Sequence, residues 1–150
     1  MDELEFRQTL GEVRDRPCVF QRPILQSRCG CKHSHKLFVA EREIIACDSI
    51  NGFKECDGFM SILKKKAAFV LHLEDPEAPI PYAKAIKLQV GAILGLKQIM
   101  GIPEQFDVPD VSEAIADSRH YFHELDKIPY EKLFSSIRNT KRRRERKKEE

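Results

Sequence analysis

The residues of this chain best suited to chemistry are five cysteines, all of which fall between positions 18 and 56. Thiolates are soft ligands that favour Zn²⁺ or an iron–sulfur cluster. An odd number of cysteines also argues against a simple set of disulfides. We therefore expect four of the five to hold a metal centre. The series is Cys18-x10-Cys29-x-Cys31-x15-Cys47-x8-Cys56.

An iron–sulfur cluster, most simply [4Fe–4S], is the first interpretation of this series. Such a cluster needs four thiolates that approach from different directions. Loop cysteines followed by Cys56 on a helix would meet that need. We expect Cys56 near the N-terminus of its helix, where backbone N–H groups and the helix dipole favour a negatively charged cluster. The spacing differs from the C-x2-C-x2-C run of bacterial ferredoxins, so it indicates a class of site rather than a named family.

A structural zinc site is the second interpretation. Its ligands would be Cys29, Cys31, Cys47 and Cys56, with His33 or His35 able to replace one thiolate. Zinc ribbons and fingers usually take their ligands from C-x2-C or C-x4-C pairs, and this chain has neither. The third interpretation is a set of buried, reduced cysteines without a metal, since cysteine is among the most buried residue types. The polar loop around Cys29-Gly30-Cys31 argues against burial there.

Spacing does not identify the fifth cysteine. Cys18 stands well apart from the others, whereas Cys29 and Cys31 are so close that binding through both would strain the loop. Gly30 between them reduces that strain.

Motifs of other chemistries are absent from the sequence. It contains no G-x-x-x-x-G-K-[ST] phosphate loop, no G-x-G-x-x-G turn and no G-x-S-x-G elbow. Arg28 and Lys32 would lower the pKa of a nearby thiol, but no base or oxyanion hole accompanies it. We therefore expect a protein that is not an enzyme on its own.

Length and charge indicate how many domains the chain has and what kind of partner it binds. The chain has 150 residues, enough for one domain with a real core. Its net charge is +2, and residues 141–150 contribute seven basic and three acidic side chains. We expect this tail to be a solvated, frayed helix end. The alternative is a tail that contacts nucleic acid, a membrane surface or an acidic partner, and its three glutamates argue against nucleic acid. No apolar run approaches the roughly 20 residues that span a bilayer, so we expect a cytoplasmic protein without a membrane span.

Prolines and helical periodicity divide the chain into elements. Residues 2–13 favour a short helix, residues 17–36 an irregular loop, and residues 37–47 an extended segment or a short helix. Asn51 or Asp57 is expected to cap a helix that runs to about Leu71 and carries Cys56 on its buried face.

The best helical pattern spans residues 82–100. Ala85, Leu88, Ala92, Leu96 and Ile99 form its inner stripe, and Gly101 ends it. Its glycines at positions 91 and 95 would let a neighbouring element approach closely. Two further helices are predicted, over residues 111–125 and from residue 130 onward, on either side of Pro129.

Together these patterns predict a mostly α fold, a small helical domain with an irregular cysteine-rich N-terminal metal-binding lobe. The single domain would span residues 1–140, with the lobe at about 17–60 and the helical part at about 57–140. We expect an iron–sulfur protein that transfers electrons or serves as an accessory subunit of a redox enzyme complex, with a protein as its partner. The alternative is a non-enzymatic zinc module that binds a protein or nucleic acid.

Overall fold

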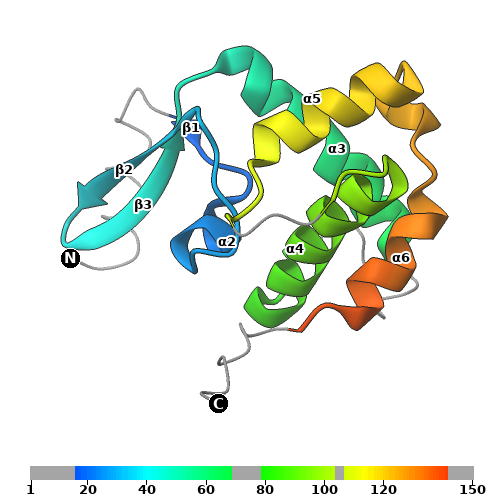
Figure 1. Cartoon of the computed structure of the whole chain (residues 1–150). Coiled ribbons are helices and arrows are strands. Elements are labelled where there is room, and N and C mark those ends of the chain that lie inside the picture. Colours follow the sequence, from blue (N-terminus) through cyan, green and yellow to red (C-terminus); the bar gives the residue numbers. More distant parts are fainter. Residues whose placement is uncertain (1–15, 69–78, 104–106, 142–150) are drawn as a thin grey trace.

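A computed structural model describes residues 16–68, 79–103 and 107–141 of the chain (Figure 1). These residues form a mostly helical molecule with a small three-stranded sheet, which agrees with the mostly α prediction in outline. In chain order the elements are β1 (Arg16–Pro17), α2 (Gln21–Leu25), β2 (Ser34–Val39), β3 (Arg42–Cys47), α3 (Ile50–Ala67), α4 (Tyr82–Ile99), α5 (Val111–Phe122), the 3-10 turn η1 (Leu125–Lys127) and α6 (Tyr130–Asn139).

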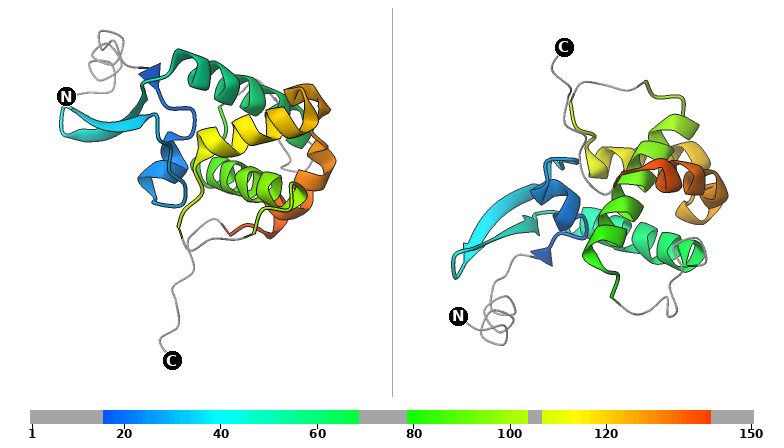
Figure 2. Two further views of the ribbon diagram at one scale, coloured as in Figure 1. Left: turned by 45° about the horizontal axis from the view of Figure 1, so that its top comes forward. Right: turned by 90° about the horizontal axis from the view of Figure 1, so that it is seen from below.

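The sheet is antiparallel, with the strand order β1-β3-β2. A tight turn at Ala40 and Glu41 joins β2 to β3, and both residues have positive φ angles, 52° and 69°. Positive φ at two consecutive residues matches the twist of a two-residue hairpin. The hairpin extends away from the helices (Figures 1 and 2). Residues 37–47 are therefore extended, one of the two predicted alternatives, whereas residues 17–36 are not uniformly irregular, since they contain α2 and the start of β2.

Helix α3 begins earlier than predicted, because Ser49 caps it rather than Asn51 or Asp57. Ser49 has an extended backbone (φ −110°, ψ 114°), and its Oγ accepts a hydrogen bond from the Gly52 amide. This is the usual geometry of an N-cap serine. With Ser49 as the cap, Cys56 is the seventh of the 18 residues of the helix, in its N-terminal half but beyond the first turn, where the free backbone N–H groups lie. The predicted end at Leu71 lies outside the described residues.

Helix α4 lies in the middle of the helical part and packs against α6, α5 and α2. Four of the five predicted stripe residues are buried, whereas Ile99 is half-buried, and burial extends beyond the stripe to Ile86, Val90 and Ile93. Gly101, with φ 72°, follows the end of the helix. Both glycines of α4 permit a close approach. A Cβ on Gly91 would lie 2.5 Å from the Ile137 Cα, and a Cβ on Gly95 would lie 3.0 Å from the Leu133 Cδ2. The prediction of close packing at these glycines is confirmed, and the neighbour is α6.

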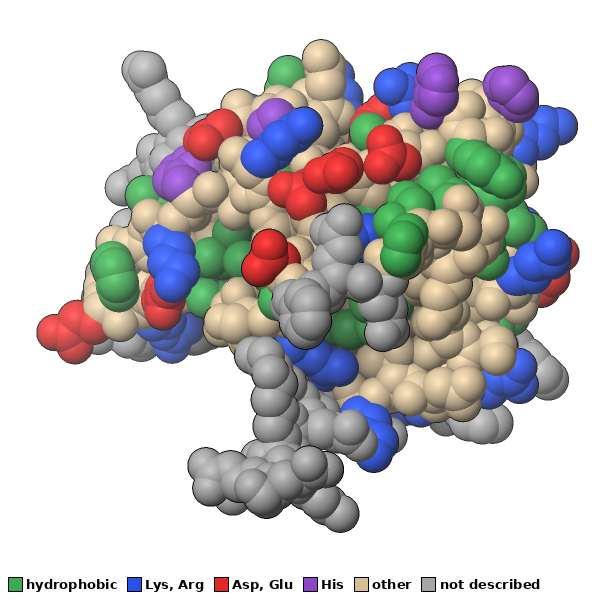
Figure 3. All heavy atoms as spheres, in the orientation of Figure 1, with side chains coloured by type: hydrophobic (Ala, Val, Ile, Leu, Met, Phe, Trp, Pro, Cys, Tyr) green, Lys and Arg blue, Asp and Glu red, His purple; other side chains and the backbone are tan. Residues whose placement is uncertain are grey.

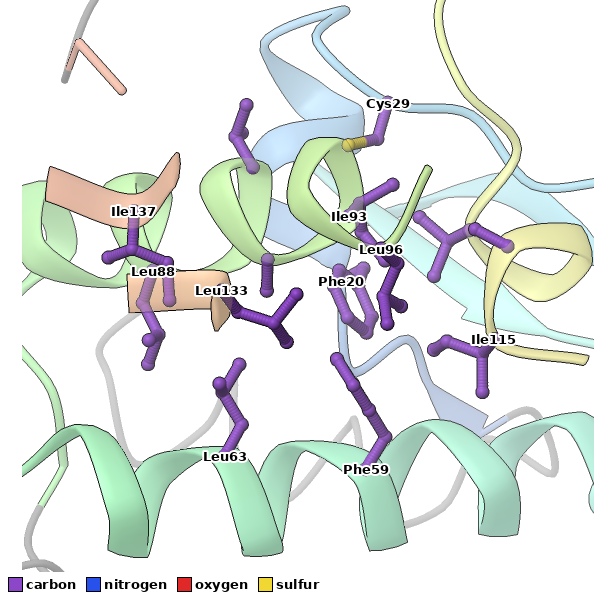
Figure 4. Close-up of a cluster of buried hydrophobic side chains, with 14 of the residues drawn as sticks. Phe20, Cys29, Phe59, Leu63, Leu88, Ile93, Leu96, Ile115, Leu133 and Ile137 are labelled. Atoms are coloured by element: carbon purple, nitrogen blue, oxygen red, sulfur yellow. The ribbon is translucent and has the colours of Figure 1, made fainter. Parts of the chain in front are cut away.

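One apolar core joins these helices to the N-terminal part of the chain (Figure 4). Phe20 reaches it from the segment before α2, Phe59 and Leu63 from α3, and Tyr130 from the start of α6. Phe59 and Tyr130 have ring centroids 5.9 Å apart. Burial of this apolar surface is the main stabilising contribution in this part of the molecule.

The last two helices follow the predicted pattern. Asp110 caps α5, and Pro129 precedes α6. The helix predicted over residues 2–13 and all of the basic tail beyond residue 141 lie outside the described residues. Among the residues that the structure describes, no helix is both long and apolar enough to cross a membrane.

Candidate metal centre

Four of the five cysteines line one small cavity. They come from four places in the chain: Cys18 follows β1, Cys31 precedes β2, Cys47 ends β3 and Cys56 lies within α3. The cavity surface is almost entirely apolar. The remaining lining residues are Val19, His33, Gly52, Phe53, Val111 and Ser112.

Cys29 lies elsewhere. Its side chain is 2% exposed and belongs to the apolar core, in the same cluster as Ile93 and Leu96 of α4 (Figure 4). Burial raises the pKa of the Cys29 thiol to about 12, so the thiol stays protonated near neutral pH. The prediction of no burial in the polar loop around Cys29 is therefore wrong for this residue. Cys29 does not line the cavity that the other four cysteines share, although Cys18 is near enough to contribute to its raised pKa.

Strand pairing brings three of the cavity cysteines together. Ser34 is paired with Cys47 across β2 and β3, and the Cys31 carbonyl accepts hydrogen bonds from the Ser34 amide (3.1 Å) and hydroxyl (2.7 Å). On the other side of β3, the Cys18 amide donates to the Ile45 carbonyl at 2.8 Å. The register of the central strand therefore determines which thiols meet at this end of the sheet.

Asp110 attaches the Cys31 loop to helix α5. Its Oδ1 accepts from the Glu113 amide at 2.9 Å, which caps α5, and its Oδ2 accepts from the Lys32 amide at 2.8 Å. Backbone bonds from Gly30 to Pro109 and from Val111 to Gly30 extend the attachment. The sequence analysis missed this residue. An Asp followed three residues later by Glu at the start of a helical pattern resembles a capping box, and that signal would have found it.

The electrostatics of the cavity follow from burial and from the nearness of the thiols. Burial raises the pKa of Cys18 to about 11 and that of Cys56 to about 12, and the other cavity thiols contribute to both increases. Thiolates this close repel one another, so each disfavours ionisation of the next. A bound cation reverses this preference and holds the thiols deprotonated.

The histidines near the cavity differ in position. His33 lines the cavity, and its carbonyl accepts a hydrogen bond from the Asp48 amide at 2.8 Å. His35 is not among the lining residues, and its Nδ1 lies 2.6 Å from the Asp48 Oδ1. Of the two histidines considered as zinc ligands, the structure therefore brings only His33 to the cysteines.

Four thiols are the donor set of two kinds of centre, a structural zinc ion and a [4Fe–4S] cluster. Tetrahedral zinc, with Zn–S bonds of about 2.3 Å, requires sulfurs about 3.8 Å apart. In the described part of the chain, no group of three or more His, Cys, Asp or Glu side chains is arranged to hold one metal ion. The cavity has a volume of about 10 Å³, which is near the least that holds a water molecule. A [4Fe–4S] cluster is much larger than a water molecule, so the four thiols would have to move apart to hold one.

Comparisons with protein-family models, with curated proteins and with solved structures gave no match to this chain.

Proposed function

We propose that this chain is an iron–sulfur protein in which Cys18, Cys31, Cys47 and Cys56 bind a [4Fe–4S] cluster. The observation that carries the proposal is that these four thiols, from four separate segments, line one apolar cavity while the fifth lies in the core. When bound, such a cluster accepts and releases single electrons.

The other lining residues would adjust the properties of the cluster. Val19, Phe53 and Val111 exclude water from the site, and solvent exposure is one of the factors that determine a cluster's potential. Helix α3 begins beside the cavity, where Gly52 and Phe53 line it. The positive end of that helix dipole favours a cluster of net negative charge. The start of α3, rather than the position of Cys56, is what supports this electrostatic argument.

A protein partner fits this proposal. Asp110, Glu113 and Asp117 lie at or in α5, whose first residues line the cavity. Acidic side chains gather over α5 in the space-filling view (Figure 3). Complementary charge steers the association of proteins, so a basic surface on a redox enzyme would dock here. We propose that the chain transfers electrons to such an enzyme or serves as its accessory subunit.

Metal analysis tests the proposal. Protein purified without oxygen should be brown and should contain about four iron and four sulfide per chain, the content of one [4Fe–4S] cluster. Dithionite should bleach the visible absorption. Stoichiometric zinc without iron, from cells grown with ample iron, would contradict the proposal and favour a zinc module.

Single substitutions test the ligand set. Cys18→Ala and Cys56→Ala should each remove most of the iron, because each takes away one of the four ligands. Cys29→Ala is the matched control, since it removes a buried thiol outside the cavity. Iron retained in the first two variants, or lost only in the control, would show that the ligands are assigned wrongly.

A further inference from the structure

A second cavity lies next to the candidate metal centre and has a different character. It has a volume of about 260 Å³ and lies between α2, α3 and α4. Cys18 and Val19 line both cavities. The other lining residues are Gln21, Arg22, Met60, Lys64, Ile80, Ala85 and Gln89.

The charged side chains that the described residues contribute to this cavity are both basic. Arg22 projects from α2 and Lys64 from the last turn of α3, and the described residues that line the cavity include no carboxylate. Arg22 is held in position by two contacts. Its Nη1 donates to the Ile80 carbonyl at 3.0 Å, and its guanidinium lies 5.4 Å from the centroid of the Tyr82 ring. A guanidinium has five N–H donors, so one bond to Ile80 leaves capacity for an anion.

Gln89 adds a hydrogen-bond acceptor at the same wall. It is 6% exposed, and its Nε2 donates to the Val19 carbonyl at 2.8 Å. Its Oε1 is buried and has no hydrogen-bond partner among the described residues. Buried polar atoms are nearly always paired, so this oxygen needs a donor such as a hydroxyl group.

We propose that this cavity binds a small organic anion, a carboxylate or a phosphate ester, that also carries a hydroxyl group. Arg22 binds the anionic group through its remaining N–H donors, since charge-assisted hydrogen bonds are the strong ones, and Lys64 adds a second positive charge to the same cavity. The Gln89 Oε1 is buried, so the hydroxyl group donates to it once the Gln89 side chain has turned toward the cavity. The volume is slightly below the usual range for ligand sites, which favours a small metabolite over a peptide.

Calorimetric titration of the full-length, metal-loaded protein tests the proposal. Glycerol 3-phosphate serves as the phosphate probe and malate as the carboxylate probe, and the two arms distinguish the anionic groups. At least one probe should show saturable, one-to-one binding that weakens as salt increases. Absence of saturable binding of both probes at millimolar concentration would overturn the proposal.

Substitutions locate the binding site. Arg22→Gln and Lys64→Gln should each weaken binding about tenfold or more, the usual effect of losing a hydrogen bond from a charged group. Lys64→Gln leaves the Arg22 contacts intact, so it tests charge even if Arg22→Gln disturbs the fold. Lys65→Gln, an exposed neighbour on the same helix, is the matched control. Equal weakening by the control would overturn the site assignment.

Binding of the anion does not depend on which metal the cysteines hold. Iron analysis of the same sample therefore separates the two proposals. Anion binding by a chain without iron would contradict only the iron–sulfur proposal, whereas a full iron content without anion binding would contradict only this one.

Discussion

The sheet and the helical part of this molecule are stabilised in different ways. The helices share one large apolar core, with Phe59, Leu63 and Leu133 among the side chains that are fully buried. The hairpin has only a small separate cluster of Val39 and Ile44 with the half-buried Leu37, and Phe38 is 73% exposed. The central strand β3 also buries Ile45 and Ala46. Hydrophobic burial therefore contributes to both regions, and among the described residues its largest cluster belongs to the helical part.

Polar contacts join the two regions at their boundary. Gln21 Oε1 accepts from the Ile45 amide at 2.7 Å, and Asp110 holds the Cys31 loop. Each such bond contributes only about 0.5–1.5 kcal/mol net. The sheet region therefore combines the burial of β3 with these polar contacts and, in our proposal, with the metal that its cysteines bind.

The largest expected effect is that of removing the metal. Chelation without oxygen should greatly increase amide hydrogen exchange in β2 and β3 and leave α4 and α6 protected, because metal binding contributes directly to folding. Exchange measured by mass spectrometry checks this. Equal loss of protection in both regions would show that the sheet and the helices unfold together. The two regions would then not be stabilised in different ways.

A substitution in the helical part should have the reverse effect. Gly91→Ala places a methyl group 2.5 Å from the Ile137 Cα, so we expect a loss of about 1–3 kcal/mol in the free energy of unfolding. Iron content should not change. Chemical denaturation measures the loss.

Gly58→Ala in α3 is the matched control for that substitution. The nearest atom to its new Cβ is the Leu125 Cδ1 at 3.7 Å, an ordinary contact. Because alanine favours helix over glycine, this variant should be more stable by about 0.5–1 kcal/mol. Similar destabilisation in both variants would mean that the close approach of α4 and α6 is not what limits Gly91.

Asp110→Ala should affect both regions, since the residue caps α5 and holds the Cys31 loop. Loss of the cap costs about 0.5–2 kcal/mol, and loss of the bond to the Lys32 amide should speed the release of iron to a chelator. The exposed Asp107 provides a control of equal charge through Asp107→Ala. Unchanged iron release in Asp110→Ala would show that the Cys31 loop is positioned by other contacts.

Truncation of the tail should have the smallest effect. Residues 142–150 comprise six basic and three acidic side chains, so their removal should change the free energy of unfolding by less than about 0.5 kcal/mol. Lys141 must remain, because its carbonyl accepts a hydrogen bond from Arg28 Nη1 at 2.7 Å. A thermal melt compares the two lengths, and a large decrease would indicate that the tail packs on the helical part.

The local sequence pattern was sufficient to predict most of the helices. The stripe of α4, its glycines and the helices that flank Pro129 were predicted from spacing of 3.6 residues and from helix-breaking residues. The start of α3 was missed. Two plausible caps lay within the helix, and the preceding strand placed Ser49 in the extended conformation that an N-cap needs.

For the candidate site too, some features followed from the sequence and others only from the tertiary structure. The sequence alone determined that five thiols lie within one short segment, and their type predicts a zinc or iron–sulfur centre. Only the tertiary structure decided that Cys29 enters the core while Cys18, Cys31, Cys47 and Cys56 share a cavity. The physical reason is that this choice depends on the register of β1 and β2 against β3 and on the packing of α3 and α5. These are contacts between distant residues, which the spacing of cysteines along the chain does not encode.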